Sequence, residues 1–190
     1  ALHRMLLDKG PAILMGHSMG GMVALQHMAR HPDQVAALVL AASSPAFGQT
    51  DGEFQKAFIA DRLAPLKAGK RMVDVAEGLL PKLCAPGYAG AGLALAQACM
   101  SSLTPEAYER ALHALVHFEQ RAVLPQITVP CLCLAAEHDL AAPPSVVERM
   151  AHKISNARSQ CLKGVGHLMN LEDPDLFAQA VFDFLEEHFK

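Results

Sequence analysis

Short apolar runs alternate with a helical pattern at the front of the chain. Residues 12–16 (AILMG) are continuously apolar, which is typical of a buried parallel strand. From Met19 to Arg30 apolar residues recur at helical spacing, and the helix should end before Pro32 because the residue preceding a proline disfavours the α region. Residues 35–43 (VAALVLAAS) form a second apolar run. Strand, helix and strand in this order predict a βαβ unit on a parallel sheet.

The pattern changes between residues 46 and 124, which contain no convincing strand. Helical periodicity returns there in pieces, interrupted by glycines and by prolines such as Pro65. The apolar content argues against a polar linker. We therefore expect residues 46–124 to form a helical cap on a core of residues 1–45 and 125–190. The predicted helices run from Phe54 to Leu63, Arg71 to Leu80, Leu93 to Ser101 and Pro105 to Phe118.

Strand patterns resume in the last third of the chain. Residues 127–139 (ITVPCLCLAAEHD) begin as an apolar run and end in polar and acidic residues. Residues 144–154 suit a helix, and residues 157–167 (ARSQCLKGVGH) suit a strand followed by a loop. Asp173 is expected to cap a final helix that has Pro174 at its first position. The whole pattern predicts an α/β protein with a parallel sheet of about four strands.

Composition narrows the class of protein. The chain has 190 residues, of which 52% are hydrophobic, and this suffices for one domain with a packed core. The formal net charge is only −3 and no long basic cluster occurs, which argues against nucleic acid or a membrane surface as a partner. No apolar run approaches the roughly 20 residues of a membrane-spanning helix. A small-molecule substrate is the expected partner.

Five cysteines are present, an odd number without a C-x-x-C pair. Cys131 and Cys133 are two residues apart, which puts both on one face of a predicted strand. Metal or redox roles are the alternative, but small buried hydrophobic side chains fit this spacing better. This cysteine usage favours a reducing cytoplasm, and neither a metal site nor a cofactor is expected.

The first predicted turn carries the sequence GHSMG at residues 16–20. This is the G-x-S-x-G pattern, placed between a strand and a helix as its chemistry requires. Such a sharp turn forces Ser18 into strained backbone angles and lifts its hydroxyl clear of the sheet. Side chains at Gly16 and Gly20 are expected to collide, which explains both glycines. A tight turn with an incidental serine is the alternative interpretation.

The two residues flanking Gly20 complete this corner. Gly21 should let the helix approach the sheet closely. The Met19 N–H lies at the predicted start of the helix, where it is expected to point toward negative charge that develops beside the serine.

A nucleophilic serine needs a base, and the base needs an orienting acid. His167 lies in a glycine-lined loop (KGVGHLMN) after the last predicted strand and is the candidate base. Asp139 opens the loop beyond the strand of residues 127–139, where catalytic groups gather in parallel sheets. Glu137 is the second candidate acid, because it is still close to that strand. Ser18, Asp139 and His167 also reproduce the chain order Ser…Asp…His.

The other histidines fit the base less well. His17 neighbours the serine, but its side chain is expected to project to the other side of the turn. His113 and His117 have a zinc-ligand spacing without a third ligand nearby, so a solvated or pocket-lining face is favoured. His27 and His31 should be solvated on a polar helix face. The remaining histidines lack a setting comparable to that of His167: His3, His138, His152 and His188.

Three segments together resemble the α/β-hydrolase fold family with a helical cap: GHSMGG (residues 16–21), VPCLCLAAEHD (129–139) and GVGHLMNLEDPDLF (164–177). The chain is similar in particular to 3-oxoadipate enol-lactonases, small carboxylesterases and carbon–carbon bond hydrolases.

The resemblance implies a role for each candidate residue. Ser18 would be the nucleophile, His167 the general base and then acid, and Asp139 the orienting carboxylate. The Met19 amide would be one oxyanion donor. Dehalogenases and epoxide hydrolases of this fold use an aspartate nucleophile, so the serine argues against them.

The family places several strands before the serine turn, and its other oxyanion donor comes from a loop among them. In this chain the first predicted strand begins near Ala12. We therefore expect a fragment of a longer protein, with reduced or no activity by itself. An uncovered apolar strand edge favours aggregation or pairing with another chain, so a homo-oligomer is an alternative to a monomer.

Three classes of function stay open. The first is a serine hydrolase acting on an ester, lactone or related carbonyl through an acyl-enzyme. A ligand-binding or signalling protein on the same fold is the second, and a structural module is the least favoured. Basic residues of the cap are candidates for recognising a substrate carboxylate, with ordinary solvated helix faces as the favoured alternative: Lys56, Arg62, Lys67, Lys70 and Arg71.

Overall fold

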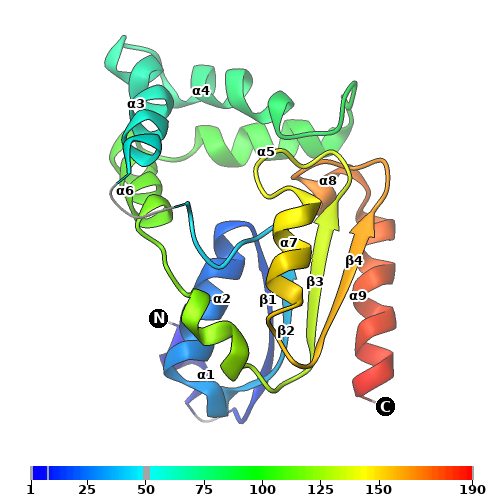
Figure 1. Ribbon diagram of the computed structural model, residues 1–190. Helices are drawn as coiled ribbons and strands as arrows, with labels where there is room; N and C mark the ends of the chain where they lie inside the picture. Colours follow the sequence, from blue (N-terminus) through cyan, green and yellow to red (C-terminus); the bar gives the residue numbers. More distant parts are fainter. Residues whose placement is uncertain (1, 8, 49–51, 190) are drawn as a thin grey trace.

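Four parallel strands form the sheet that carries the candidate site (Figure 1). The computed structural model describes residues 2–7, 9–48 and 52–189. Neighbouring strands follow one another in chain order, so the predicted α/β class with a four-stranded parallel sheet is confirmed. The strands are β1 (Ala12–His17), β2 (Val35–Ala41), β3 (Cys131–Ala136) and β4 (Ala157–Leu162).

Helices cover both faces of this sheet. Helices α2 (Met19–Arg30) and α7 (Pro144–Ala151) pack on one face, and α9 (Pro174–His188) packs on the other (Figure 1). Side chains alternate along β2, so that Leu38 lies in the core under α2 and α7 while Val39 lies in the core under α9. Burial on both faces explains why the strands appear as continuous apolar runs in the sequence.

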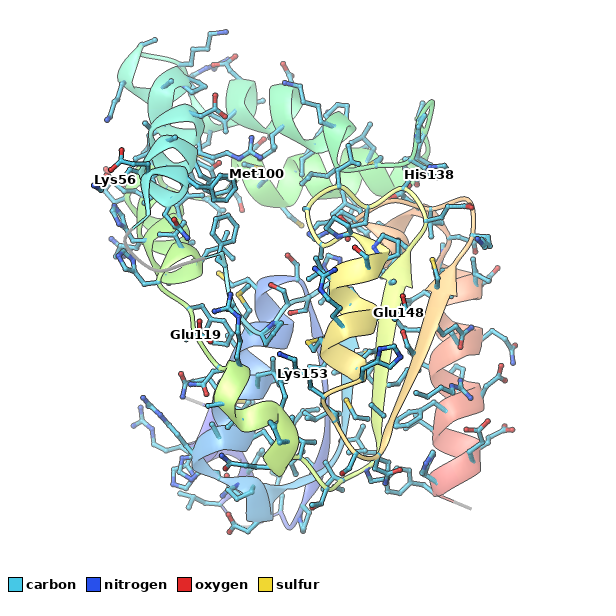
Figure 2. All side chains as sticks on the ribbon, in the orientation of Figure 1. Lys56, Met100, Glu119, His138, Glu148 and Lys153 are labelled. Atoms are coloured by element: carbon cyan, nitrogen blue, oxygen red, sulfur yellow. The ribbon has the colours of Figure 1, made fainter. Side chains whose placement is uncertain are left out.

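A layer of helices lies between β2 and β3 in the chain and sits over the carboxyl ends of the strands (Figure 1). Met100 lies within this layer (Figure 2), where it packs against both of its small apolar clusters. The layer therefore has a core of its own. Its helices are α3 (Glu53–Lys67), α4 (Met72–Leu79), α5 (Ala91–Ser101) and α6 (Pro105–Val116), with 3-10 turns at Leu80–Lys82 and Arg121–Gln126.

The prediction that Pro65 interrupts a helix is wrong. Helix α3 continues through Pro65 and ends at Lys67. A proline removes one N–H donor from the helix, and near the last turn this loss affects few hydrogen bonds. The Pro65 carbonyl accepts a hydrogen bond from the Lys70 N–H at 3.0 Å, which closes the helix end.

The predicted start of α9 is confirmed. The Asp173 side chain accepts a hydrogen bond from the Leu176 N–H at 2.9 Å, and Pro174 occupies the first helical position. A short helix, α8 (Met169–Glu172), precedes this cap and was not predicted. Only Asp173 separates α8 from α9. The connection from the His167 loop to α9 is therefore short and is ordered by local hydrogen bonds.

Strand β1 is the edge of the sheet in the part of the chain that the structure describes. It pairs with β2, and the side chains of Ile13 and Met15 are exposed. A short helix, α1 (Leu2–Leu6), precedes it. Among the described residues, none of the helices combines the length and apolar character that crossing a membrane requires.

The two strand cysteines share one face, as predicted. Cys131 and Cys133 are free and fully buried on the side of α2 and α7, with their Sγ atoms 3.9 Å apart. Their mutual hydrogen bond and their burial raise the pKa of the Cys131 thiol well above its usual range. Both side chains contribute to core packing, and the Cys131 thiol stays uncharged.

Candidate active site

Ser18 stands at the strained corner that the sequence predicts. Its φ of 53° and ψ of −120° lie outside the regions that non-glycine residues favour. The Ser18 N–H donates to the Ala41 carbonyl at 2.8 Å, which ties the corner to the end of β2. Met19 is the first residue of α2, so its N–H has no acceptor within the helix and lies at the positive end of the helix dipole.

The glycines around Ser18 have different physical roles. A Cβ atom at Gly16 would lie 2.3 Å from the Gly20 carbonyl oxygen, so only glycine fits there. A Cβ atom at Gly21 would lie 2.5 Å from the Ser43 hydroxyl, which confirms the expected close approach of α2 to the sheet. The expectation for Gly20 itself is wrong, because a Cβ atom there would meet open space.

Ser18, His167 and Asp139 form one hydrogen-bonded chain. The Ser18 Oγ lies 2.9 Å from the His167 Nε2, and the His167 Nδ1 lies 2.8 Å from the Asp139 Oδ2. The other carboxylate oxygen of Asp139 accepts hydrogen bonds from the N–H groups of Ala141 and Ala142, at 2.7 and 2.9 Å. The structure thus brings together three residues that lie far apart in the sequence, and both Asp139 oxygens are engaged.

Electrostatics keep Asp139 ionised although it is only 2% exposed. Burial by itself raises the pKa of the carboxyl, but the hydrogen bond and charge of His167, with the amides of Ala142 and Ala141, lower the pKa below its ordinary value. Glu137, the second candidate acid, is instead exposed and accepts hydrogen bonds from Lys163 and the Gly164 N–H. Asp139 is therefore the carboxylate that contacts the histidine.

The loop of His167 is held by the helical layer and by α8. The His167 N–H donates to the Leu83 carbonyl at 2.7 Å. The Glu172 carboxylate accepts a hydrogen bond from the Ala85 N–H at 2.7 Å and from the Gly166 N–H at 3.0 Å. A Cβ atom at Gly166 would lie 2.5 Å from the Ala85 nitrogen, so the two loops are in close contact. No pattern in the sequence indicated these contacts.

Two further residues support the site. His17 was expected to point to the other side of the turn, but its Nε2–H donates to the His167 carbonyl at 2.6 Å. Burial lowers the pKa of His17, so its ring stays neutral beside His167. The buried Ser43 hydroxyl donates to the Ser18 carbonyl at 2.8 Å. Ser43 follows β2, the parallel neighbour of β1, and this position is the sequence signal that could have indicated it.

The other histidines behave in different ways. His27 is buried, contrary to the expected solvated position, and it packs beside His31 with ring centroids 5.1 Å apart. The buried face of α2 is wider than the positions of its polar residues indicated, and it includes His27. The His117 Nδ1 bonds the His113 carbonyl, at 2.7 Å. In the described ranges, no group of three His, Cys, Asp or Glu side chains could hold a metal ion.

A cavity of about 460 Å³ adjoins Ser18 and His167. Ligand pockets in proteins typically measure about 300–1,000 Å³, so this cavity suits a small molecule. Most of its wall is apolar, and residues 46–124 supply many of the apolar side chains, among them Phe47, Phe54 and Leu112.

The family model described as "Alpha/beta hydrolase family" matches residues 1–180 of this chain. The chain belongs to the alpha/beta hydrolase family. Membership of this family explains the serine corner, the parallel sheet and the Ser–Asp–His order together.

Similar proteins agree with this family. Over 191 aligned residues the chain is 28% identical to the pimeloyl-[acyl-carrier protein] methyl ester esterase of Neisseria meningitidis, covering 93% of this chain and 69% of that protein. The enol-lactonase from Burkholderia xenovorans LB400 has a similar structure, with a TM-score of 0.84, 27% identity, and coverage of 97% of this chain and 69% of that chain. The resemblance to enol-lactonases and esterases is thus confirmed.

A thermophilic esterase from Thermogutta terrifontis shares the fold, with a TM-score of 0.86 at 24% identity. The match covers 100% of this chain and 70% of that esterase.

Proposed function

We propose that this protein is a serine hydrolase that cleaves a carboxylic ester or lactone through an acyl-enzyme. Ser18 is the nucleophile, His167 is the general base and then acid, and Asp139 is the orienting carboxylate. The observation that carries the proposal is the unbroken chain of hydrogen bonds from Ser18 through His167 to Asp139, at 2.9 and 2.8 Å. Esterases and an enol-lactonase among the similar proteins support an ester-type substrate.

The first half of the reaction acylates the serine. The Ser18 oxygen attacks the carbonyl carbon of the ester while the His167 Nε2 takes the hydroxyl proton. The Met19 N–H donates to the oxyanion of the tetrahedral intermediate. When this intermediate collapses, the ester C–O bond breaks and the imidazolium gives its proton to the leaving oxygen. The products of this half are an alcohol and an acyl group on Ser18.

The second half releases the acid. A water molecule replaces the alcohol, and the His167 Nε2 takes one of its protons as the oxygen attacks the acyl carbon. Collapse of the second tetrahedral intermediate breaks the bond to Ser18, whose oxygen recovers the proton from His167. The net reaction consumes one ester and one water and yields one acid and one alcohol, with no redox change and no added cofactor.

Asp139 acts through His167 in both halves. Its Oδ2 accepts the Nδ1–H of the imidazole, which leaves Nε2 free to take the proton from the serine. Its carboxylate also stabilises the imidazolium that forms in each half. Residues 46–124 serve as a cap in this proposal, because they supply most of the apolar wall around the substrate.

A fluorophosphonate probe tests the nucleophile. We expect the full-length protein to be labelled on Ser18, and its Ser18→Ala variant to lose both the label and about 10⁶-fold in kcat. Ser159→Ala is a matched control, because Ser159 lies exposed on β4, away from the cavity. Failure of the full-length wild-type protein to label, together with ligand binding that Ser18→Ala leaves unchanged, would contradict the proposal and favour a binding protein on the same fold.

A further inference from the structure

A second pocket lies beside the cavity of Ser18 and takes no part in the proposed reaction. Its volume is about 310 Å³, and it opens between α7 and the 3-10 turn of Arg121–Gln126, which lie on the same face of the sheet (Figure 1). Neither Ser18 nor His167 lines it. The pocket adjoins the cavity of Ser18, because four residues line both: Ser44, Ala46, Gly48 and Val146.

Three cationic side chains converge on this second pocket. Arg121 belongs to the 3-10 turn, Arg149 to α7, and Lys153 follows the end of α7. Among the described residues that line the pocket, none is acidic. The chain as a whole has a formal net charge of −3, so this concentration of positive charge is local. A concave site with three cations and no carboxylate in its wall attracts an anion.

The guanidinium of Arg121 is held in place by its neighbours. Its Nη1 donates to the Glu119 carboxylate, and its Nη2 donates to the Gly48 carbonyl at 2.5 Å. Glu119 offsets part of the positive charge of Arg121. Because a guanidinium has five N–H donors, these two contacts leave further N–H groups of Arg121 available to an acceptor in the pocket.

Arg149 and Lys153 supply charge that no carboxylate offsets. Both residues are exposed, and neither side chain has an ion pair or a hydrogen bond with another described residue. A cation near the last turn of a helix also stabilises the helix dipole, but that effect requires no further cation from another segment. The pocket therefore combines two free cationic side chains of the α7 segment with a fixed guanidinium opposite them.

We infer that this second pocket binds a phosphate monoester with an apolar organic part, at a site separate from the catalytic cavity. A phosphate monoester carries a charge of about −1.5 to −2 at pH 7 and three acceptor oxygens, which match two free cations and a guanidinium. The rest of the wall is mostly apolar, with Pro45, Leu124 and Met150, and suits the organic part. The pocket volume of about 310 Å³ restricts the ligand to a small molecule.

Calorimetric titration of the full-length protein with phenyl phosphate tests the inference. Methyl phenyl phosphate is the control for charge, because it keeps the ring and has a single negative charge. Orthophosphate is the control for the organic part. At constant ionic strength we expect phenyl phosphate to bind more tightly than either control. Arg149→Gln and Lys153→Gln should each weaken its binding about tenfold, because each removes one charge-assisted hydrogen bond.

Two further variants locate the binding. Arg110→Gln is the matched control, because Arg110 is exposed on α6 and lines neither the pocket nor the cavity of Ser18. Ser18→Ala alters the catalytic cavity alone. Both variants should bind phenyl phosphate with the affinity of the wild type. Arg149 and Lys153 are exposed, so their variants should also keep the wild-type Tm, and a loss of binding then reports recognition and not folding.

The inference is overturned if phenyl phosphate does not bind at millimolar concentration, or if Arg149→Gln and Lys153→Gln bind it as the wild type does. The three cations are then ordinary solvated residues. Binding that Ser18→Ala weakens to the same extent would place the ligand in the catalytic cavity and also overturn the inference. Equal affinity for methyl phenyl phosphate contradicts the phosphate contact, and equal affinity for orthophosphate contradicts the organic part. The proposed hydrolase reaction is tested separately, by the fluorophosphonate label.

Discussion

Replacing Glu172 by alanine should loosen the loop that carries His167. The Glu172 carboxylate accepts hydrogen bonds from the Ala85 N–H at 2.7 Å and from the Gly166 N–H at 3.0 Å. Both donor residues are buried, so the alanine variant leaves two buried N–H groups without an acceptor. Each such group costs about 1–3 kcal/mol, which gives a loss of about 2–6 kcal/mol in the free energy of unfolding.

Thermal unfolding measures this loss. For a chain of this size a loss of 1 kcal/mol lowers Tm by roughly 2–4 °C, so Glu172→Ala should lower Tm by roughly 4–24 °C. Glu172→Gln retains one carbonyl acceptor and should give an intermediate value. Ester turnover should fall as well, because Gly166 immediately precedes His167.

The matched control is Glu186→Ala, which removes an exposed carboxylate of α9 that has no ion pair among the described residues. It should leave Tm nearly unchanged. If Glu172→Ala unfolds at the same temperature as this control, the Glu172 hydrogen bonds do not stabilise the contact between the two loops, and the reasoning is refuted.

Three further predictions concern the serine corner and its acid. Gly16→Ala should lower Tm strongly, because its Cβ would lie 2.3 Å from the Gly20 carbonyl, whereas Gly20→Ala should be tolerated; thermal unfolding of the two variants compares them directly. Asp139→Asn should lower kcat about 10⁴-fold in ester turnover. The pKa of Asp139 is lower in the folded protein than its ordinary value of 3.8. Its contribution to stability is therefore fully present above pH 3.8 and is lost as the pH falls through the lower folded-state pKa. Acid unfolding of the Asn variant should lack this loss. Ser43→Ala should cost about 0.5–1.5 kcal/mol in unfolding free energy, measured with denaturant, because the Ser18 carbonyl keeps its second hydrogen bond.

The sequence by itself determined the parts of the protein that depend on neighbouring residues. The helix from Met19 to Arg30 was predicted to the residue, because its apolar spacing and the following proline act locally. The strained corner at Ser18 was predictable in the same way, since the strand, the glycine at position 16 and the helix are contiguous. Parallel pairing followed from the βαβ order, because a crossover helix returns the chain to the edge of the sheet where the first strand began, so the second strand runs in the same direction.

Only the tertiary structure decided which side chains meet across the fold. It separated Asp139, which contacts the histidine, from Glu137, which contacts Lys163. It also placed Arg62 in the cavity wall, unlike four other basic residues of the helical layer. A sequence pattern reports the periodicity of a helix face but not what packs against that face. The contacts of Asp139 and Arg62 could therefore not be predicted from the pattern alone.

The contact of Glu172 with Ala85 has the same origin. These residues lie 87 positions apart, and their hydrogen bond exists because the helical layer and the loop of His167 are folded onto each other. Local propensity carries no information on such a contact, whose energy depends on burial and on donors from a distant segment. The positions of Ser18 and Gly16 depend on adjacent residues, whereas the positions of Asp139, the helical layer and the cavity wall depend on packing between distant segments.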